Sequence, residues 1–90
     1  MKEEMIKRIH EMALRTWNAI GADALINEDG EFDESRTLTR DEVIEIVGDA
    51  DRMLYYGGDK EAYKEYLKID GWDAKCEVLK GAFSFRTYGY

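Results

Sequence analysis

The sequence predicts an α+β fold, in which two long amphipathic helices and a short third helix pack on a C-terminal antiparallel β-hairpin. Three observations lead to this fold class. Apolar residues recur at helical spacing through the first half of the chain. A complete capping box marks the start of the second helix. Near the C-terminus the apolar residues alternate with polar ones, which is typical of a strand. The 90 residues are expected to form one domain, 1–90.

The first predicted helix carries its apolar residues on a single stripe. They recur at intervals of 3, 4, 4 and 3 positions, at Ile6, Ile9, Ala13, Trp17 and Ile20. Another face carries Glu4 with Arg8 and Glu11 with Arg15, each pair spaced i,i+4 in the favourable order. This pattern predicts an amphipathic helix whose outer face holds ion pairs within the helix.

The end of the first helix has two alternatives. Gly21 favours an end at that position. Ala24, however, continues the apolar stripe, so the helix can also run to about Ile26 at the cost of one interior glycine. Residues 27–37 are polar and contain the turn pair Asp29-Gly30, which predicts a loop.

The second helix has the clearest start in the chain. Thr39 is the expected N-cap and Glu42 stands at N3, which makes a capping box. Gly57-Gly58 is expected to end this helix, and Gly48 is a point at which it can bend. The broad apolar face between these signals consists of Val43, Ile46, Val47, Ala50, Met53 and Leu54.

A short third helix and a hairpin complete the prediction. Asp59 is the expected cap of the third helix, and Asp70-Gly71 ends it. Lys80-Gly81 is then a two-residue turn that leads to a return strand over residues 83–87. The first strand is predicted from the alternation of Trp72, Ala74, Cys76 and Val78 with polar neighbours. Because a two-stranded ribbon is only marginally stable alone, its apolar face must pack on the helices or on a second chain.

Composition excludes several classes of protein. The single cysteine, Cys76, rules out an internal disulfide, which fits a cytoplasmic location. The N-terminus shows no signal peptide, and no apolar run approaches the ~20 residues that span a bilayer. An acidic chain with a net charge of −7 is also poorly suited to bind anionic membranes or nucleic acid directly.

The residue types that carry chemistry are too few to predict an enzyme. His10 is the only histidine, and it lies at the edge of the apolar stripe of the first helix. Cys76 alternates inward with apolar residues, so it is expected to be a small core residue rather than a reactive thiol. One histidine and one cysteine do not make a zinc site. We therefore expect no catalytic residues, no metal and no cofactor.

The acidic charge is concentrated in one part of the chain. Residues 23–51 hold eleven acidic and two basic residues, a formal charge of −9, whereas the remainder holds nine acidic and eleven basic residues. Within this segment Asp41, Glu45 and Asp49 are spaced i, i+4, i+8 along the predicted second helix. The preceding loop adds Glu28, Asp29, Glu31, Asp33 and Glu34. These eight residues are the candidate binding site, with a solvated face that only maintains solubility as the alternative.

The charge pattern predicts a small non-enzymatic module that binds a protein through a basic surface or a nucleic-acid-binding groove. In its specific form the module is an inhibitor that mimics nucleic acid, and it is similar to small acidic inhibitors of phages and mobile elements in size and charge alone. One alternative is a self-associating structural or regulatory domain, a homodimer formed through the edge of the C-terminal hairpin. Another is weak divalent-metal binding by the loop at Asn27–Asp33, although Leu25 and Arg36 occupy the first and twelfth positions that an EF-hand reserves for carboxylates.

Overall fold

The computed structural model describes residues 2–21, 26, 29–31 and 38–83. Within these residues all the regular structure is helical, and there is no β-strand or sheet. The predicted α+β fold is therefore wrong. The five helices are α1 (Glu3–Ile20), α2 (Arg40–Val47), α3 (Ala50–Gly57), α4 (Lys60–Lys68) and α5 (Trp72–Lys80).

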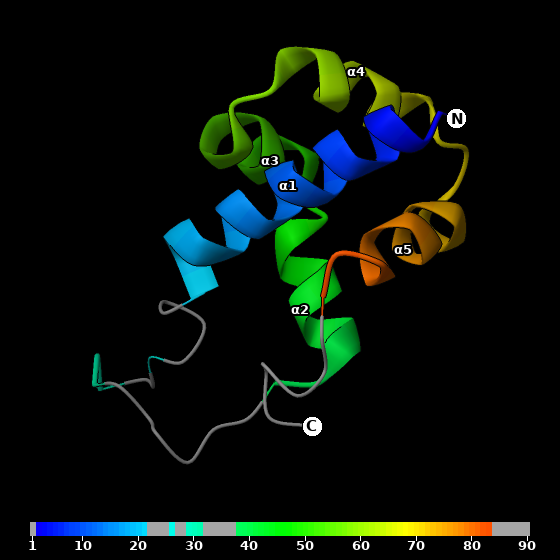
Figure 1. Cartoon of the computed structure of the whole chain (residues 1–90). Coiled ribbons are helices and arrows are strands. Elements are labelled where there is room, and N and C mark those ends of the chain that lie inside the picture. The colour runs from blue at the N-terminus through cyan, green and yellow to red at the C-terminus, as the bar shows by residue number, and fades with distance from the viewer. Residues whose placement is uncertain (1, 22–25, 27–28, 32–37, 84–90) are drawn as a thin grey trace.

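The helices are arranged around α1, which contacts each of the other four. In Figure 1, α1 crosses the molecule with α3 and α4 above it in this view and α2 and α5 below it. Every helix contributes to one hydrophobic core. Its buried members are Ile9, Met12, Ala13, Leu38, Val43, Ile44, Val47, Met53, Ala62, Tyr66, Leu79 and Phe83.

The buried face of α1 includes more than the predicted apolar stripe. Ile9, Ala13 and Ile20 are buried as expected, and Met12 and Thr16 are buried beside them. The Thr16 hydroxyl donates a hydrogen bond of 2.9 Å to the Met12 carbonyl, so a polar group is accommodated in the core without losing its partner. The helix ends at Ile20 with Gly21 as its C-cap, the shorter of the two alternatives.

The contact between α1 and α3 depends on a residue without a side chain. A Cβ atom at Gly57 would lie 2.2 Å from Cγ of Met12, which is closer than real atoms approach. Gly57 therefore allows the two backbones to pack closely. The next residue, Gly58, ends α3 in the left-handed conformation at φ 70°, which glycine adopts without strain.

The predicted second helix is broken in two. The capping box of Thr39 and Glu42 is confirmed, with both of its hydrogen bonds present. The chain leaves the helical path at Gly48, and the Asp49 side chain accepts a 3.0 Å hydrogen bond from the Arg52 amide, which starts α3. A residue of α4 also stabilises the break, because the buried Tyr66 hydroxyl donates a hydrogen bond of 2.8 Å to the Gly48 carbonyl. A weak helix former followed by a strong N-cap residue is the local cause.

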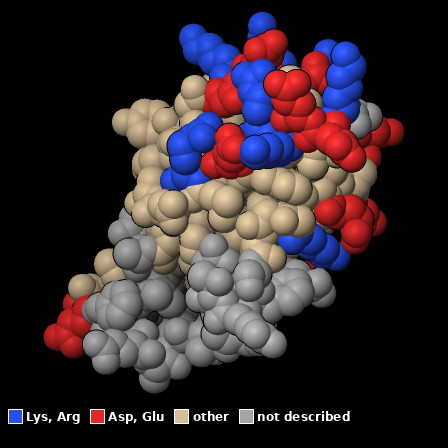
Figure 2. All heavy atoms as spheres, viewed as in Figure 1, with Lys and Arg blue, Asp and Glu red and all other residues tan. Residues whose placement is uncertain are grey.

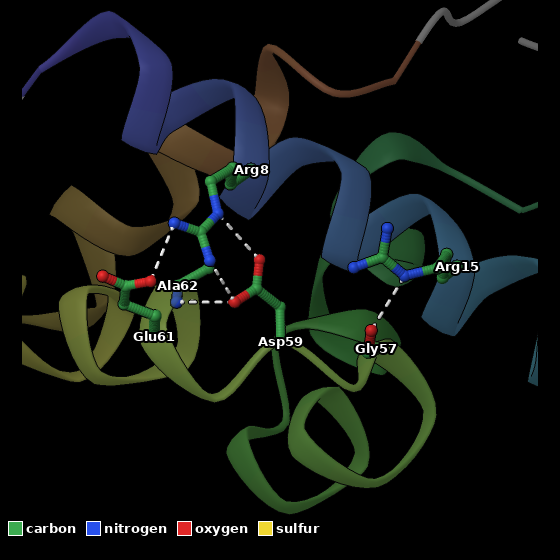
Figure 3. A network of polar contacts seen from close by, with 6 residues as sticks. All are labelled: Arg8, Arg15, Gly57, Asp59, Glu61 and Ala62. Carbon is green, nitrogen blue, oxygen red and sulfur yellow. Dashed lines mark hydrogen bonds and ion pairs between the residues drawn. The ribbon is translucent and has the colours of Figure 1, made fainter.

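Two arginines of α1 join it to the α3–α4 connection (Figure 3). Arg8 makes a two-pronged contact with Asp59, at 3.0 and 2.7 Å, and a third bond of 3.1 Å to Glu61. Arg15 donates to the Gly57 carbonyl at 2.8 Å. These contacts between helices replace the ion pairs within α1 that the sequence suggested. Asp59 is also the N-cap of α4, as predicted.

The predicted hairpin is the main error, because residues 72–80 form α5. A helical stripe spaced 4, 3 and 4 runs through Trp72, Cys76, Leu79 and Phe83, and it overlaps the alternating pattern that indicated a strand. The helix buries Leu79 completely, whereas the strand would have turned it outward. Gly81 is the C-cap of α5 rather than part of a hairpin turn. The return strand lies outside the described residues beyond Phe83.

Candidate functional site

The structure describes five of the eight predicted site residues. Asp41 and Glu45 lie exposed on α2, Asp49 is exposed at the start of α3, and Asp29 and Glu31 are exposed in the segment before α2. The other three, Glu28, Asp33 and Glu34, lie outside the described residues.

The continuous row of carboxylates predicted along one helix is wrong. Asp41 and Glu45 do share α2, but the break at Gly48 removes Asp49 from that helix. The Asp49 carboxylate instead accepts the backbone N–H of Arg52 as an N-cap. The regular spacing on which mimicry of nucleic acid was based is therefore reduced to one pair of acids, Asp41 and Glu45.

These two acids border a cleft between α2 and α5. The cleft has a volume of about 420 Å³. Its lining combines charged, aromatic, aliphatic and thiol groups. The residues are Asp41, Ile44 and Glu45 from α2 and Trp72, Asp73, Cys76 and Lys80 from α5.

The electrostatic balance of the cleft is negative. Of the lining residues that the structure describes, three are carboxylates and one is an ammonium group, Lys80. The Lys80 ammonium forms an ion pair of 3.0 Å with Glu77, which is not among the lining residues. Within the described part of the chain Asp41, Glu45 and Asp73 have no ion pair or hydrogen bond to their carboxylates. The cleft therefore offers three carboxylates that form no ion pair with any cation among the described residues.

Arg52 does not neutralise Glu45 from the other side. Glu45 also lines a second depression of about 330 Å³, together with Glu42, Ile46 and Arg52. The Arg52 guanidinium donates to the Ile46 carbonyl at 3.3 Å. The Arg52 guanidinium thus binds a backbone oxygen rather than the Glu45 carboxylate.

Trp72 gives the cleft an aromatic wall. Trp72 is 47 % exposed, so part of its indole is accessible from the cleft. The part of the ring nearest the core packs on Gly48, where an added Cβ would lie 2.6 Å from a ring carbon. The break between α2 and α3 therefore positions this wall, because only glycine leaves room for the ring at Gly48. Ile44 of α2 is buried and adds an apolar side chain to the lining of the cleft.

Cys76 lines the same cleft as a free thiol. Burial raises the pKa of the Cys76 thiol, and the neighbouring carboxylates of Asp73, Asp41 and Glu77 raise it further, against an opposing effect of Lys80. A thiol that keeps its proton is a poor nucleophile. The expectation of an unreactive cysteine agrees with this environment.

His10, the single histidine, has a structural contact. Its Nε2 lies 2.7 Å from the Val78 carbonyl of α5 and donates a hydrogen bond to it. Its ring also packs on Gly81, where an added Cβ would meet the ring at 2.8 Å. His10 therefore helps to join α1 to the end of α5, and it is half-buried at the edge of the apolar stripe of α1.

The α5 half of the cleft does not follow from the alternating sequence pattern. That pattern places Trp72, Asp73 and Lys80 in a strand and its turn, so it does not predict their position beside α2. The signal that identifies them is the helical stripe of Trp72, Cys76, Leu79 and Phe83, which places α5 against the core.

Acidic residues of α4 and its N-cap are paired, whereas Glu4 and Glu11 of α1 have no ion pair with another described residue. Asp59 and Glu61 bind Arg8, and Glu65 binds Lys68 at 2.9 Å. Figure 2 shows acidic and basic side chains interspersed over the upper part of this face, where Figure 1 places α1 and α4. Among the described residues, carboxylates without an ion pair therefore occur at the α2–α5 cleft as well as on α1, whereas Glu61 and Glu65 of α4 are paired.

The described residues contain no group of three or more His, Cys, Asp or Glu side chains arranged to hold a metal ion. Most of the loop proposed for divalent-metal binding, Asn27–Asp33, lies outside the residues that the structure describes. Of the helices α1 to α5, none has the length and apolar character needed to cross a membrane.

A scan against models of known protein families gives no match, and searches of curated proteins and of solved structures give none either.

Proposed function

We propose that this chain is a non-enzymatic protein-binding module that uses the acidic face of α2 to engage a basic surface on its partner. The observation that supports the proposal is the pair Asp41 and Glu45. Both are exposed, and neither carboxylate has a cationic partner among the described residues. Exposed carboxylates without a partner attract cations through solution and favour a partner whose surface potential is complementary.

The basic surface includes, as one possibility, a groove built for nucleic acid. The break at Gly48 leaves two α2 carboxylates in register instead of three, so the proposal requires a basic patch on the partner but not a phosphate-like repeat. Self-association through a hairpin edge is not proposed, because residues 72–80 form a helix and supply no strand edge.

Affinity capture with charge-neutral variants tests this function. Asp41→Asn/Glu45→Gln removes two charges and takes the net charge from −7 to −5. The matched control, Glu4→Gln/Glu11→Gln, reaches the same −5 through two exposed residues of α1. Partners are identified by mass spectrometry, and their affinity is then measured by calorimetry.

The expected result is that the α2 variant loses its basic partner at low salt while the α1 control retains it. Circular dichroism confirms that both variants are folded. Capture of the same partner with equal affinity by all three proteins overturns the proposal. Equal losses in the two variants also overturn it, because net charge alone would then account for binding.

A further inference from the structure

We propose that the cleft between α2 and α5 binds the guanidinium group of one arginine side chain presented by a protein partner. The indole of Trp72 stacks on the guanidinium plane, and the carboxylates of Asp41, Glu45 and Asp73 accept its N–H groups. This inference rests on the proposed function and names the group that the acidic face recognises.

The residues that line the cleft favour a cationic ligand. Three carboxylates without ion pairs line a concave surface of about 420 Å³, and they come from two different helices. A cation placed between α2 and α5 can therefore be approached by acceptors from both sides. The described residues hold no cluster suited to a metal ion, so a polyatomic cation with several donors fits the arrangement better.

The aromatic wall favours arginine over lysine. A guanidinium is planar, has five N–H donors, and is less strongly hydrated than an ammonium group. It can stack on an indole while it donates at its edge to carboxylates. Trp72 is 47 % exposed beside Asp41, Glu45 and Asp73, so both kinds of contact are available in one cleft. Lysine would gain the charge attraction but not the planar stacking.

Lys80 provides an independent test of the proposal. Of the lining residues that the structure describes it is the one cation, and it pairs with Glu77 at 3.0 Å. An incoming guanidinium is repelled by this ammonium group. Removing the Lys80 charge should therefore tighten binding, which a role for Lys80 as a ligand-binding residue would not predict.

The experiment follows peptide binding through the fluorescence emission of Trp72, which lines the cleft. The chain has two tryptophans, and Trp17→Phe leaves Trp72 as the sole source of indole fluorescence. The probe is a short glycine peptide, blocked at both ends, with one central arginine. Its counterparts carry lysine or citrulline, the latter being an uncharged analogue of arginine with the same shape. Titration with each peptide gives the change in Trp72 emission and the dissociation constant.

The arginine peptide is expected to change Trp72 emission and to bind at least about tenfold more tightly than the citrulline peptide, a difference of about 1.4 kcal/mol. In the Trp17→Phe background, Glu45→Gln and Asp41→Asn should each weaken binding severalfold, whereas Glu11→Gln should leave it within about twofold. Lys80→Gln should tighten binding by about two- to fivefold. The lysine peptide should bind more weakly than the arginine peptide.

Equal binding of the arginine and citrulline peptides overturns the inference, as does an unchanged Trp72 emission at saturation. Equal binding of the lysine and arginine peptides overturns the assignment to arginine. Weaker binding by Lys80→Gln would show that the peptide does not meet this ammonium group and would also contradict the inference. If any of these results occurs while Asp41→Asn/Glu45→Gln still loses the captured partner, the cleft is excluded but the proposed function stands.

Discussion

Asp59 has two structural roles that can be separated by substitution. Its Oδ1 accepts the Ala62 amide at 3.1 Å, which caps α4, and the same carboxylate pairs with Arg8 of α1 (Figure 3). Asparagine retains the capping oxygen but loses the charge, whereas alanine loses both. One side chain thus fixes the start of α4 and its attachment to α1.

We predict that Asp59→Ala destabilises the protein more than Asp59→Asn, with a difference of about 0.5–2 kcal/mol from the lost cap. Urea unfolding followed by circular dichroism measures both variants. An equal loss in the two variants would mean that the cap makes no net contribution and that the Arg8 pair accounts for the whole effect.

The same residue predicts a dependence on pH. The hydrogen bonds from Arg8 hold the pKa of the Asp59 carboxyl below its usual value. The unfolded chain therefore binds this proton at a higher pH, near 4, than the folded chain does. The stability that the charge contributes is fully present above about pH 4 and is lost as the pH falls through the lower folded value. The advantage of the wild type over Asp59→Asn should shrink over this range, whereas the gap between Asn and Ala should remain.

At the scale of elements, the break between α2 and α3 depends on a residue of α4. The Tyr66 ring is completely buried, and its hydroxyl is the donor to the Gly48 carbonyl. Burial also raises the pKa of Tyr66 to about 12, so the hydroxyl keeps its proton over the physiological range. Removing this donor leaves a buried carbonyl without its partner, and that is costly because no water replaces the bond.

Tyr66→Phe should therefore cost about 1–3 kcal/mol although the ring is retained. Tyr63→Phe is the matched control on the same helix, because Tyr63 is half-buried and its hydroxyl forms no hydrogen bond with another described residue. Its cost should stay within about 0.5 kcal/mol. Thermal or urea unfolding of both variants gives the comparison, and similar values for the two would argue against a role of the Gly48 bond in holding the break.

The helix boundaries that depend on neighbouring residues could be predicted from the sequence, whereas the one that depends on a distant contact could not. The Thr39–Glu42 capping box, the Asp59 cap and the stop at Gly57-Gly58 act through neighbouring residues, and all three are confirmed. The break at Gly48 needs the distant Tyr66 hydroxyl as well as local propensity, so the sequence indicated a bend but not two helices.

The strand prediction for residues 72–80 is wrong because a period-two pattern and a helical pattern share residues in this segment. Trp72 and Cys76 belong both to an alternating pattern and to the helical stripe that continues to Leu79 and Phe83. Its other residues, such as Ala74 and the lysines, favour a helix. A hairpin would also need further strands for stability, whereas a helix satisfies its own backbone hydrogen bonds and buries Leu79. For the site, the sequence identified Asp41 and Glu45 but not the α5 residues that face them.

A pair of leucine substitutions tests this assignment. Leu79 is completely buried on α5, whereas Leu67 on α4 is 48 % exposed. Leu79→Ala should cost about 2–5 kcal/mol because it leaves a cavity in the core. Leu67→Ala, the same chemical change, should stay within about 0.5 kcal/mol. Urea denaturation measures both, and a small cost for Leu79→Ala would contradict the helical packing of this segment.

At the scale of the whole molecule, the chain has a net charge of −7, and only some of its described acidic residues form ion pairs. Ion pairs with Arg8 and Lys68 neutralise acids of α4, whereas Asp41, Glu45 and Asp73 have no such partner in the described part of the chain. Figure 2 shows the mixture of signs on the α1 and α4 side. An approaching basic surface therefore meets a group of three carboxylates beside α2 and α5 that no described cation pairs with.

This uneven field predicts how association depends on salt. Stopped-flow measurement of Trp72 emission in the Trp17→Phe background gives the association rate of an arginine-rich peptide. The rate should fall steeply between about 0.01 and 0.15 M ionic strength, over which the screening length drops from about 30 to about 8 Å, while the dissociation rate changes less. Asp41→Asn/Glu45→Gln should flatten this dependence more than Glu4→Gln/Glu11→Gln, although both carry a net charge of −5. A rate that is insensitive to salt, or equal flattening in the two variants, would mean that no local field at α2 steers the encounter.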